Sequence, residues 1–414
     1  MHLFAAVVDT SAASIPYITL LQHLHTRNIE SCLYITQENQ HYIQQFDVPY
    51  IVDDFDLKAH IYGNQAVESG TSGLRMFIST RAIMSAYVPS MMVKIHQAVK
   101  SGKVNPSATR FLGNGMSLVY LGHFLLELGF KEFICVEPYR LIDWLGTWEN
   151  ETSQFIPGFL SQGFAARTLM SSQHGHTLAQ KHFNDHIHYT YNDIKAAVVA
   201  HIHTYSPQLA TDKAIALGYP YPTVEDGALD STISDFIANA KANQRKVIAF
   251  TIGSMNLDAD KKRHLIDEFA KGIVELGASG LILGSGDIYY DHCLSVNDFV
   301  PYTKLFREVD LVVTHGGAGT AHLALWAGTP VLSVPFIPDQ HDWAKRLANI
   351  NISAGVLPRE RFNAQTFAKL VRDNHTPTLV EQAKRCGEIE RRENGDSRRA
   401  VDAIAAIAQT PIQR

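Results

Sequence analysis

Short runs of apolar residues alternate along the chain with longer stretches in which apolar residues recur at helical spacing. The first run is LFAAVV (3–8), and apolar residues then follow every three or four positions between Ile15 and Leu24. Runs of the same kind follow at SCLYIT (31–36), RFLG (110–113) and FICVEP (133–138), with a helical stretch at 117–130 before the last of them. Continuous apolar strands with helices between them are typical of a parallel sheet buried on both faces, so this half predicts an α/β domain.

The alternation is interrupted by the segment 219–235 and then begins again. This segment, YPYPTVEDGALDSTISD, combines prolines with acidic and small residues, which is typical of a linker. Further apolar runs follow at KVIAFTIGSM (246–255), GLILGS (280–285), LVVTHGG (311–317) and PVLSVP (330–335). We therefore expect two α/β domains, over residues 1–218 and 241–395, joined by a linker at 219–240.

The composition narrows the class of protein. The chain has 414 residues, of which 46% are hydrophobic and 19% charged, which suits two domains with sizeable cores. Its formal net charge of −5 argues against a nucleic-acid-binding protein, whose binding surface is usually basic. The apolar start of the sequence, residues 1–24, lacks a basic region and is interrupted by Asp9 and Pro16, so we expect no signal peptide. No apolar stretch is long enough for a membrane span, although peripheral contact with a membrane stays compatible with the sequence.

The four cysteines, Cys32, Cys135, Cys293 and Cys386, are far apart and form no CxxC pair. This spacing favours free thiols in a reducing compartment, and we expect a cytoplasmic protein.

The segment THGGAGTAHLALWAG (314–328) follows an apolar strand and opens a helical stretch. Glycines allow the backbone to approach a ligand closely, and a helix N-terminus offers N–H groups and a partial positive charge. Together they favour an anion site, most often one for phosphate, to which Thr320 and His315 can add side-chain donors. A tight turn that only begins a helix is the simpler alternative.

Asp339 and Gln340 follow the next predicted strand, PVLSVP. A carboxylate beside an amide can accept and donate hydrogen bonds at once, which suits the neighbouring hydroxyls of a sugar. Because this pair comes one strand after a candidate phosphate site, the two features together indicate a ligand that carries both groups.

The segment from Thr314 to Leu347 resembles the donor-binding signature of nucleotide-sugar-dependent glycosyltransferases of the GT-B fold. HGGAGT, the helix end before Pro330 and the loop with Asp339, Gln340 and Trp343 match the variant found in sterol and bacterial natural-product glycosyltransferases. The resemblance implies two doubly wound, Rossmann-like α/β domains that face each other across a cleft. The N-terminal domain would bind the acceptor and the C-terminal domain the nucleotide sugar, while a last helix over 396–414 would pack back on the N-terminal domain.

The resemblance also implies roles for individual residues. Two further matches are TIGSM (251–255), whose Ser254 would face the diphosphate, and DFVPY (298–302). In the latter, Phe299 would stack on the base and the backbone of Val300 would bond its edge. Trp343 would lie near the donor or pack the loop. The remaining implied contacts are His315, Gly317, Gly319 and Thr320 to the diphosphate, and Asp339 and Gln340 to the sugar.

One position departs from many relatives, which carry a glutamate for the ribose hydroxyls where this chain has Leu323. Sterol-type relatives often lack this glutamate too. UDP is the nucleotide that the resemblance favours, with dTDP as the alternative.

The resemblance implies an inverting transfer of a hexose, glucose above others, from the nucleotide sugar to a small acceptor, with no metal or other cofactor required. Such a transfer needs a general base to take the proton from an acceptor hydroxyl. Aligning on Pro16 places Ala13 at the usual base position, and alanine cannot accept a proton. Asp9 could serve instead, as could a histidine such as His123, or the acceptor could itself be anionic.

Two other functions stay open on the sequence alone. A catalytically silent relative would bind a nucleotide sugar without transferring it, and a sugar-nucleotide 2-epimerase would convert the donor without an acceptor. His182 and His186, four residues apart in a histidine-rich stretch, could hold a metal on one helix face. No glutamate lies between them as in HExxH and no cysteine is nearby, so we expect no metal site there.

Overall fold

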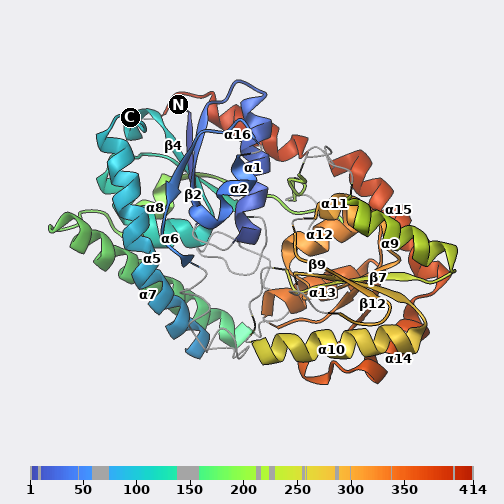
Figure 1. Ribbon diagram of the computed structural model, residues 1–414. Helices are drawn as coiled ribbons and strands as arrows, with labels where there is room; N and C mark the ends of the chain where they lie inside the picture. The colour runs from blue at the N-terminus through green and yellow to red at the C-terminus, as the bar shows by residue number, and fades with distance from the viewer. Residues whose placement is uncertain are drawn as a thin grey trace. The chain divides into compact units, whose positions relative to one another are not determined.

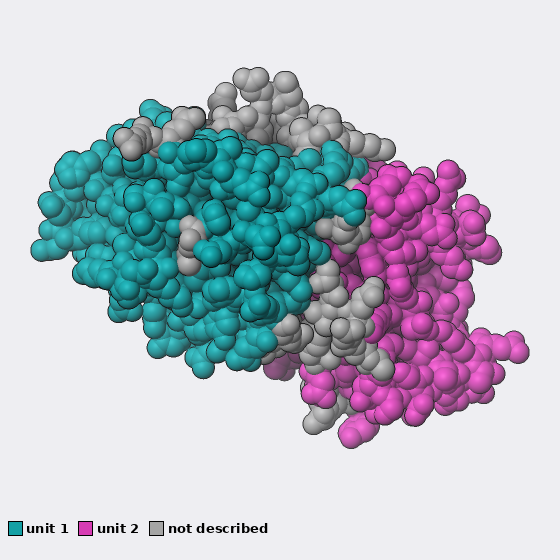
Figure 2. All heavy atoms as spheres, turned by 90° about the horizontal axis from the view of Figure 1, so that it is seen from above, with its two compact units in different colours: residues 1–207, 211–220, 397–414 teal, residues 208–210, 221–396 magenta. Residues whose placement is uncertain are grey.

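The computed structural model describes residues 2–7, 11–44, 46–57, 74–137, 158–210, 216–222, 229–253, 257, 259–284, 289–298, 300–336, 338–394 and 397–412. The chain divides into two compact units, coloured separately in Figure 2. Unit 1 comprises residues 1–207, 211–220 and 397–414, and unit 2 comprises residues 208–210 and 221–396.

Unit 1 is built on a sheet of six parallel strands in the order β3-β2-β1-β4-β5-β6 (Figure 1). Its strands are β1 (Leu3–Ala6), β2 (Ser31–Thr36), β3 (Tyr50–Asp53), β4 (Arg110–Gly113), β5 (Phe133–Glu137) and β6 (Val198–His203). Its helices are α1 (Ser11–His25), α2 (Gln40–Ile43), α5 (Leu74–Lys100), α6 (Gly115–Glu127), α7 (Gly158–Phe183), α8 (Tyr191–Ala197) and α16 (Arg398–Ala408).

Both faces of this sheet are buried. Along β1, Leu3 and Ala5 face one apolar cluster with α1 and α16, whereas Phe4 and Ala6 face another with α5 and α6. This alternation follows from the two-residue period of a strand and explains why the strand sequences are apolar throughout. Helix α16 comes from the far end of the chain and packs against α1 and β6 in this unit.

Unit 2 repeats the plan with six parallel strands in the order β12-β11-β10-β7-β8-β9. Its strands are β7 (Val247–Thr251), β8 (Ser279–Leu283), β9 (Cys293–Val296), β10 (Leu311–Thr314), β11 (Val331–Ser333) and β12 (Ser353–Val356). Its helices are α9 (Ser231–Ala242), α10 (Ala259–Leu276), α11 (Tyr302–Glu308), α12 (Ala318–Ala327), α13 (Pro338–Asn349), α14 (Ala364–Asn374) and α15 (Pro377–Asn394). The α/β class with two parallel, doubly wound sheets, expected from the sequence, is confirmed.

Two local features differ from the sequence-based expectation. Helix α1 begins at Ser11, before the helical spacing that starts at Ile15. It contains Pro16, which lacks the N–H that would bond to the carbonyl of Ala12. Most of α9 lies within 219–240, the range expected to be a linker, where the Asp230 carboxylate accepts a hydrogen bond from Thr232 N–H and begins the helix.

The histidine-rich stretch does not present His182 and His186 on one helix face, because α7 ends at Phe183. His182 Nε2 instead lies 2.9 Å from His96 Nδ1 on α5. Among the described residues, no group of three or more histidine, cysteine or acidic side chains is placed to hold a metal.

His123 of α6 is part of the same packing between helices. Its Nδ1 donates to the carbonyl of Tyr189 at 2.9 Å, and its Nε2 lies 2.9 Å from the Ser172 hydroxyl, which donates to it. Burial lowers the pKa of His123 from 6.5 to about 4. Both nitrogens are thus satisfied in the neutral ring, which gives His123 a structural role rather than that of a base.

The four cysteine thiols are free, and burial raises the pKa of Cys32 to about 11. Within the described ranges, no helix combines the length and apolarity needed to cross a membrane.

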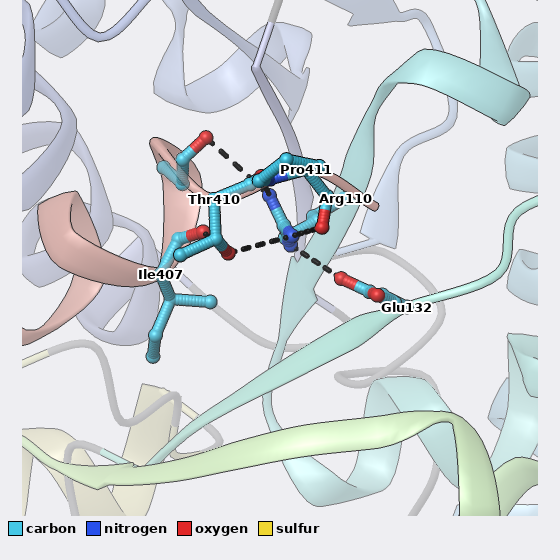
Figure 3. A network of polar contacts seen from close by, with 6 residues as sticks. Arg110, Glu132, Ile407, Thr410 and Pro411 are labelled. Carbon is cyan, nitrogen blue, oxygen red and sulfur yellow. Dashed lines mark hydrogen bonds and ion pairs between the residues drawn. The ribbon is translucent and has the colours of Figure 1, made fainter. Parts of the chain in front are cut away.

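Arg110, at the start of β4, forms hydrogen bonds with residues 408–411 at the end of α16 and just after it (Figure 3). Its side chain is 3% exposed and pairs with Glu132 through Nε at 2.6 Å. Its two terminal nitrogens donate to the backbone carbonyls of Ala408, Thr410 and Pro411 and to the Thr410 hydroxyl, at 3.0–3.3 Å. A single guanidinium therefore satisfies a buried carboxylate and the carbonyls that follow α16.

Replacing Arg110 with alanine would remove the guanidinium from the buried Glu132 carboxylate and from the carbonyls of residues 408, 410 and 411. We expect the free energy of unfolding to fall by about 3–5 kcal/mol. Urea denaturation measures this change. The matched control is Arg27→Ala, which breaks an exposed ion pair between Arg27, in the turn after α1, and Asp402 of α16 and should cost less than about 1 kcal/mol. Equal losses of unfolding free energy in Arg110→Ala and Arg27→Ala would contradict the stabilising role assigned to the buried Arg110.

His123 predicts a pH dependence of stability. Because its pKa is lower in the folded protein than in the unfolded chain, its contribution is fully present above pH 6.5 and is lost as the pH falls toward about 4. The difference between the two pKa values corresponds to about 3 kcal/mol. We expect His123→Gln to show a smaller loss of unfolding free energy over this range than wild type, and equal losses in the two proteins would contradict this role of His123.

Candidate functional site

Three neighbouring strands of unit 2 end in register at one edge of the sheet. Thr314, the last residue of β10, pairs with Thr251 of β7 on one side and with Ser333 of β11 on the other. The loops that leave these strands therefore begin side by side. In open parallel sheets, ligands bind at the carboxyl ends of the strands.

His315 follows Thr314 and lies in the space between two glycines of different loops. A Cβ atom added to Gly253 would lie 2.4 Å from His315 Cε1, and one added to Gly317 would lie 2.4 Å from His315 Nε2. Both distances are far below van der Waals contact, so the ring occupies the room that side chains at these two positions would need. Gly253 also has a φ of +58°, which disfavours any other residue.

Burial fixes the charge of this imidazole. His315 is 7% exposed, and burial lowers its pKa from 6.5 to about 4. At neutral pH the ring is therefore uncharged and carries one N–H. It can contribute a hydrogen bond to a ligand but no positive charge.

Helix α12 begins directly beyond His315, with Gly317 as its N-cap. Glycine has no side chain to cap the first turn, and the first N–H bonded within the helix is that of Ala321, to the Gly317 carbonyl at 2.9 Å. The N–H groups of residues 318–320 therefore point out of the helix end, where its dipole favours an anion. Gly319 and Thr320 lie in this first turn, as the anion-site interpretation expects.

Helix α13 starts at the end of the neighbouring strand β11 and carries Asp339 and Gln340 in its first turn. Gln340 is buried, and its Oε1 accepts a hydrogen bond from the Phe336 N–H at 2.8 Å, which holds the loop before the helix. A Cβ on Gly316, whose φ is +81°, would lie 3.0 Å from the Gln340 carbonyl oxygen. The loops after β10 and β11 are thus packed against each other, which brings the phosphate-type and sugar-type candidates together.

Trp343 packs rather than faces a ligand. It is 2% exposed, and its ring meets that of His322 edge-to-face at 4.9 Å between centroids. The Arg346 guanidinium lies 5.4 Å from the Trp343 ring centre and pairs with Asp342 at 2.7 Å. The contact between Trp343 and His322 joins α13 to α12.

Val300 is buried just before α11. Two residues later, the Tyr302 hydroxyl lies 2.9 Å from Thr251 Oγ1, which connects this segment to the end of β7. Ser254, Phe299 and Asp9 lie outside the described residues, and Ala13 lies in the first turn of α1. Of the residues implied by the resemblance, the structure brings together His315, Gly317, Gly319, Thr320, Asp339 and Gln340 at the ends of β10 and β11.

Sequence reasoning missed three contributors to this region. Gly253 belongs to the TIGSM segment, in which the resemblance assigns a role to Ser254 alone, and its own signal is its place directly after an apolar strand. Thr314 contacts His315 Nδ1 at 3.2 Å, and its signal was its place as the last residue of a strand before a histidine. Arg359, whose guanidinium lies 5.4 Å from the Phe336 ring centre, follows β12 and had no local signal.

Comparison with known proteins gives relatives in sequence for part of the chain. No family model matches it. A sterol 3-beta-glucosyltransferase of Cryptococcus neoformans is 28% identical over 186 residues, which is 41% of this chain and 12% of the fungal protein. A sterol 3-beta-glucosyltransferase of Arabidopsis thaliana is 31% identical over 158 residues, which is 37% of this chain and 25% of the plant protein. The chain therefore spans only a small part of the length of these relatives.

Solved structures match almost the whole chain in fold. The glycosyltransferase of kitacinnamycin superimposes with a TM-score of 0.68 at 14% identity, covering 98% of each chain. A UDP-glucose:anthocyanidin 3-O-glucosyltransferase in complex with UDP superimposes with a TM-score of 0.64 at 13% identity, also covering 98% of each chain. The two-domain arrangement of parallel sheets is thus the GT-B fold.

The packing around His315 predicts a specific effect of Gly253→Ala. The new methyl group would displace the imidazole from its place between Gly253 and Gly317. We therefore expect anion binding at the start of α12, measured by calorimetry with UDP as the probe, to weaken at least about tenfold, or about 1.4 kcal/mol. Gly277→Ala is the matched control, since Gly277 has a similar φ of +61° but no atom within 4 Å of an added Cβ. If Gly253→Ala and Gly277→Ala bind UDP with equal affinity, the affinity does not depend on the position of the His315 imidazole.

Proposed function

We propose that this chain, which has the GT-B fold, is a glycosyltransferase of the UDP-glycosyltransferase superfamily and uses a UDP-sugar as donor. One observation carries the proposal. A neutral imidazole lies between two glycines at the start of α12, whose first-turn N–H groups point out of the helix end. This arrangement supplies several N–H donors to a diphosphate in a small volume.

The donor would lie along the carboxyl ends of β7, β10 and β11. His315, Gly317, Gly319 and Thr320 would hold the diphosphate, with Ser254 from the loop after β7. The sugar hydroxyls would meet the side chains of Asp339 and Gln340 at the start of α13, next to the diphosphate because Gly316 and Gln340 pack together. Phe299 and the backbone of Val300 would hold the base.

The reaction would be an inverting displacement. The acceptor oxygen forms a bond to the anomeric carbon, while the bond from that carbon to the diphosphate oxygen breaks and UDP leaves. Charge then develops on the diphosphate, where the N–H groups of α12 and of the His315 ring stabilise it. These groups supply the electrostatic stabilisation, so the proposal requires no metal.

The proton of the acceptor hydroxyl must reach a base. Ala13 cannot accept it, and His123 already makes two hydrogen bonds inside the protein. We propose Asp9, which follows the same strand as Ala13, as the base.

The acceptor that we propose is a small hydrophobic alcohol, and the sugar is glucose. The support is the partial similarity to sterol 3-beta-glucosyltransferases, whose names specify both. A hydrophobic acid is the second acceptor class, because a carboxylate needs no base.

Transfer of labelled glucose from UDP-glucose to a panel of sterols, other hydrophobic alcohols and hydrophobic acids tests the proposal. We expect a glycoside product whose rate does not change with a metal chelator and falls about 100-fold or more in His315→Ala, because a donor to the leaving group is lost. In the same assay, Asp9→Asn should slow transfer to alcohols but not to acids.

Three outcomes would contradict parts of this account. UDP-glucose binding without turnover on any acceptor favours a silent binding protein, which Ala13 would explain. Conversion of the donor without an acceptor favours a 2-epimerase. Wild-type rates for Asp9→Asn on alcohols would exclude Asp9 as the base while leaving the transferase assignment intact.

A further inference from the structure

Within the described residues, the hydroxyl of Thr314 has one hydrogen-bond acceptor within reach, which is Nδ1 of His315. Its Oγ1 is buried, accepts the Gly316 N–H at 3.4 Å and lies 3.2 Å from His315 Nδ1. Among the described residues, no other acceptor lies within hydrogen-bond distance of this hydroxyl. A hydroxyl that accepts from the Gly316 N–H and donates to Nδ1 uses both contacts that its geometry offers, so we place the proton of Thr314 toward Nδ1.

We propose that Thr314 is a positioning residue that fixes the tautomer of His315, with Nδ1 accepting from Thr314 and the ring proton on Nε2. In the opposite tautomer, Nδ1–H would donate to Thr314, and the Thr314 proton would have no acceptor within the described part of the chain. Which nitrogen carries the proton follows here from the partner of the other one.

The consequence lies on the far side of the ring. Nε2 is the atom next to Gly317, the N-cap of α12, and it makes no hydrogen bond within the described residues. The proposed tautomer therefore adds an N–H donor beside the N–H groups of residues 318–320. The opposite tautomer would place a lone pair there, which would repel an anion.

This inference deepens the proposed function and rests on it only for the identity of the anion. The tautomer itself is a property of the protein without ligand. Because burial keeps the ring neutral, the ring carries one proton, on either Nδ1 or Nε2. Which nitrogen carries it decides whether Nε2 attracts or repels a diphosphate.

The test measures the tautomer by NMR of protein labelled with ¹⁵N-histidine, with the His315 signals assigned by their loss in His315→Ala. We expect the Nε2–H form in wild type and Thr314→Ser, and a shift toward the Nδ1–H form in Thr314→Val, which keeps the β-branched shape but lacks the hydroxyl. Ser333→Ala is the matched control, because it removes a buried hydroxyl in register with Thr314 that has no hydrogen-bond partner among the described residues. An unchanged tautomer in Thr314→Val overturns the proposal.

Calorimetry with UDP supplies the functional readout. Thr314→Val should bind UDP about tenfold more weakly, and Thr314→Ser should restore the affinity. In a His315→Ala background, Thr314→Val should cause no further loss, because its effect passes through the ring. A full additional loss there would overturn the proposal. If wild type shows the Nε2–H form but does not bind UDP, the proposed function fails while the tautomer assignment stands.

Discussion

The imidazole of His315 can lie at the start of α12 only because three parallel strands end in register and two of the loops that follow carry glycine where the ring needs room. Gly253 follows β7 and Gly317 begins α12 after β10, and a Cβ atom at either position would overlap the ring. The position of His315, the open first turn of α12 and the packing of the β11 loop on Gly316 all depend on this close contact. The candidate site is therefore a product of sheet register rather than of any single motif.

Burial makes both His123 and His315 neutral, yet it leads to different roles. In unit 1, each ring nitrogen of His123 has a protein partner, so the residue joins helices. In unit 2, only Nδ1 of His315 has a partner within the described residues, and Nε2 faces a helix N-terminus. The same loss of charge thus produces a packed residue in one unit and a hydrogen-bond donor for an anion in the other.

The sequence predicts most strands of the fold and part of the candidate site, and particular residues show why. The apolar runs at 31–36 and 110–113 coincide with β2 and β4, because strands buried on both faces leave little room for polar residues. Local pattern also indicated the helix start at Gly317. It could not reveal that Gly253 lies against His315, since these residues are 62 positions apart and meet only through sheet register. The spacing of His182 and His186 likewise could not show that α7 ends at Phe183, between the two histidines.

The most direct measurement of the central claim is a crystal structure of the protein with UDP. The account predicts diphosphate oxygens within hydrogen-bond distance of His315 Nε2 and of the N–H groups of residues 318–320, with His315 still between Gly253 and Gly317. A structure in which UDP binds with its phosphates elsewhere, or in which His315 turns away from α12, would contradict it.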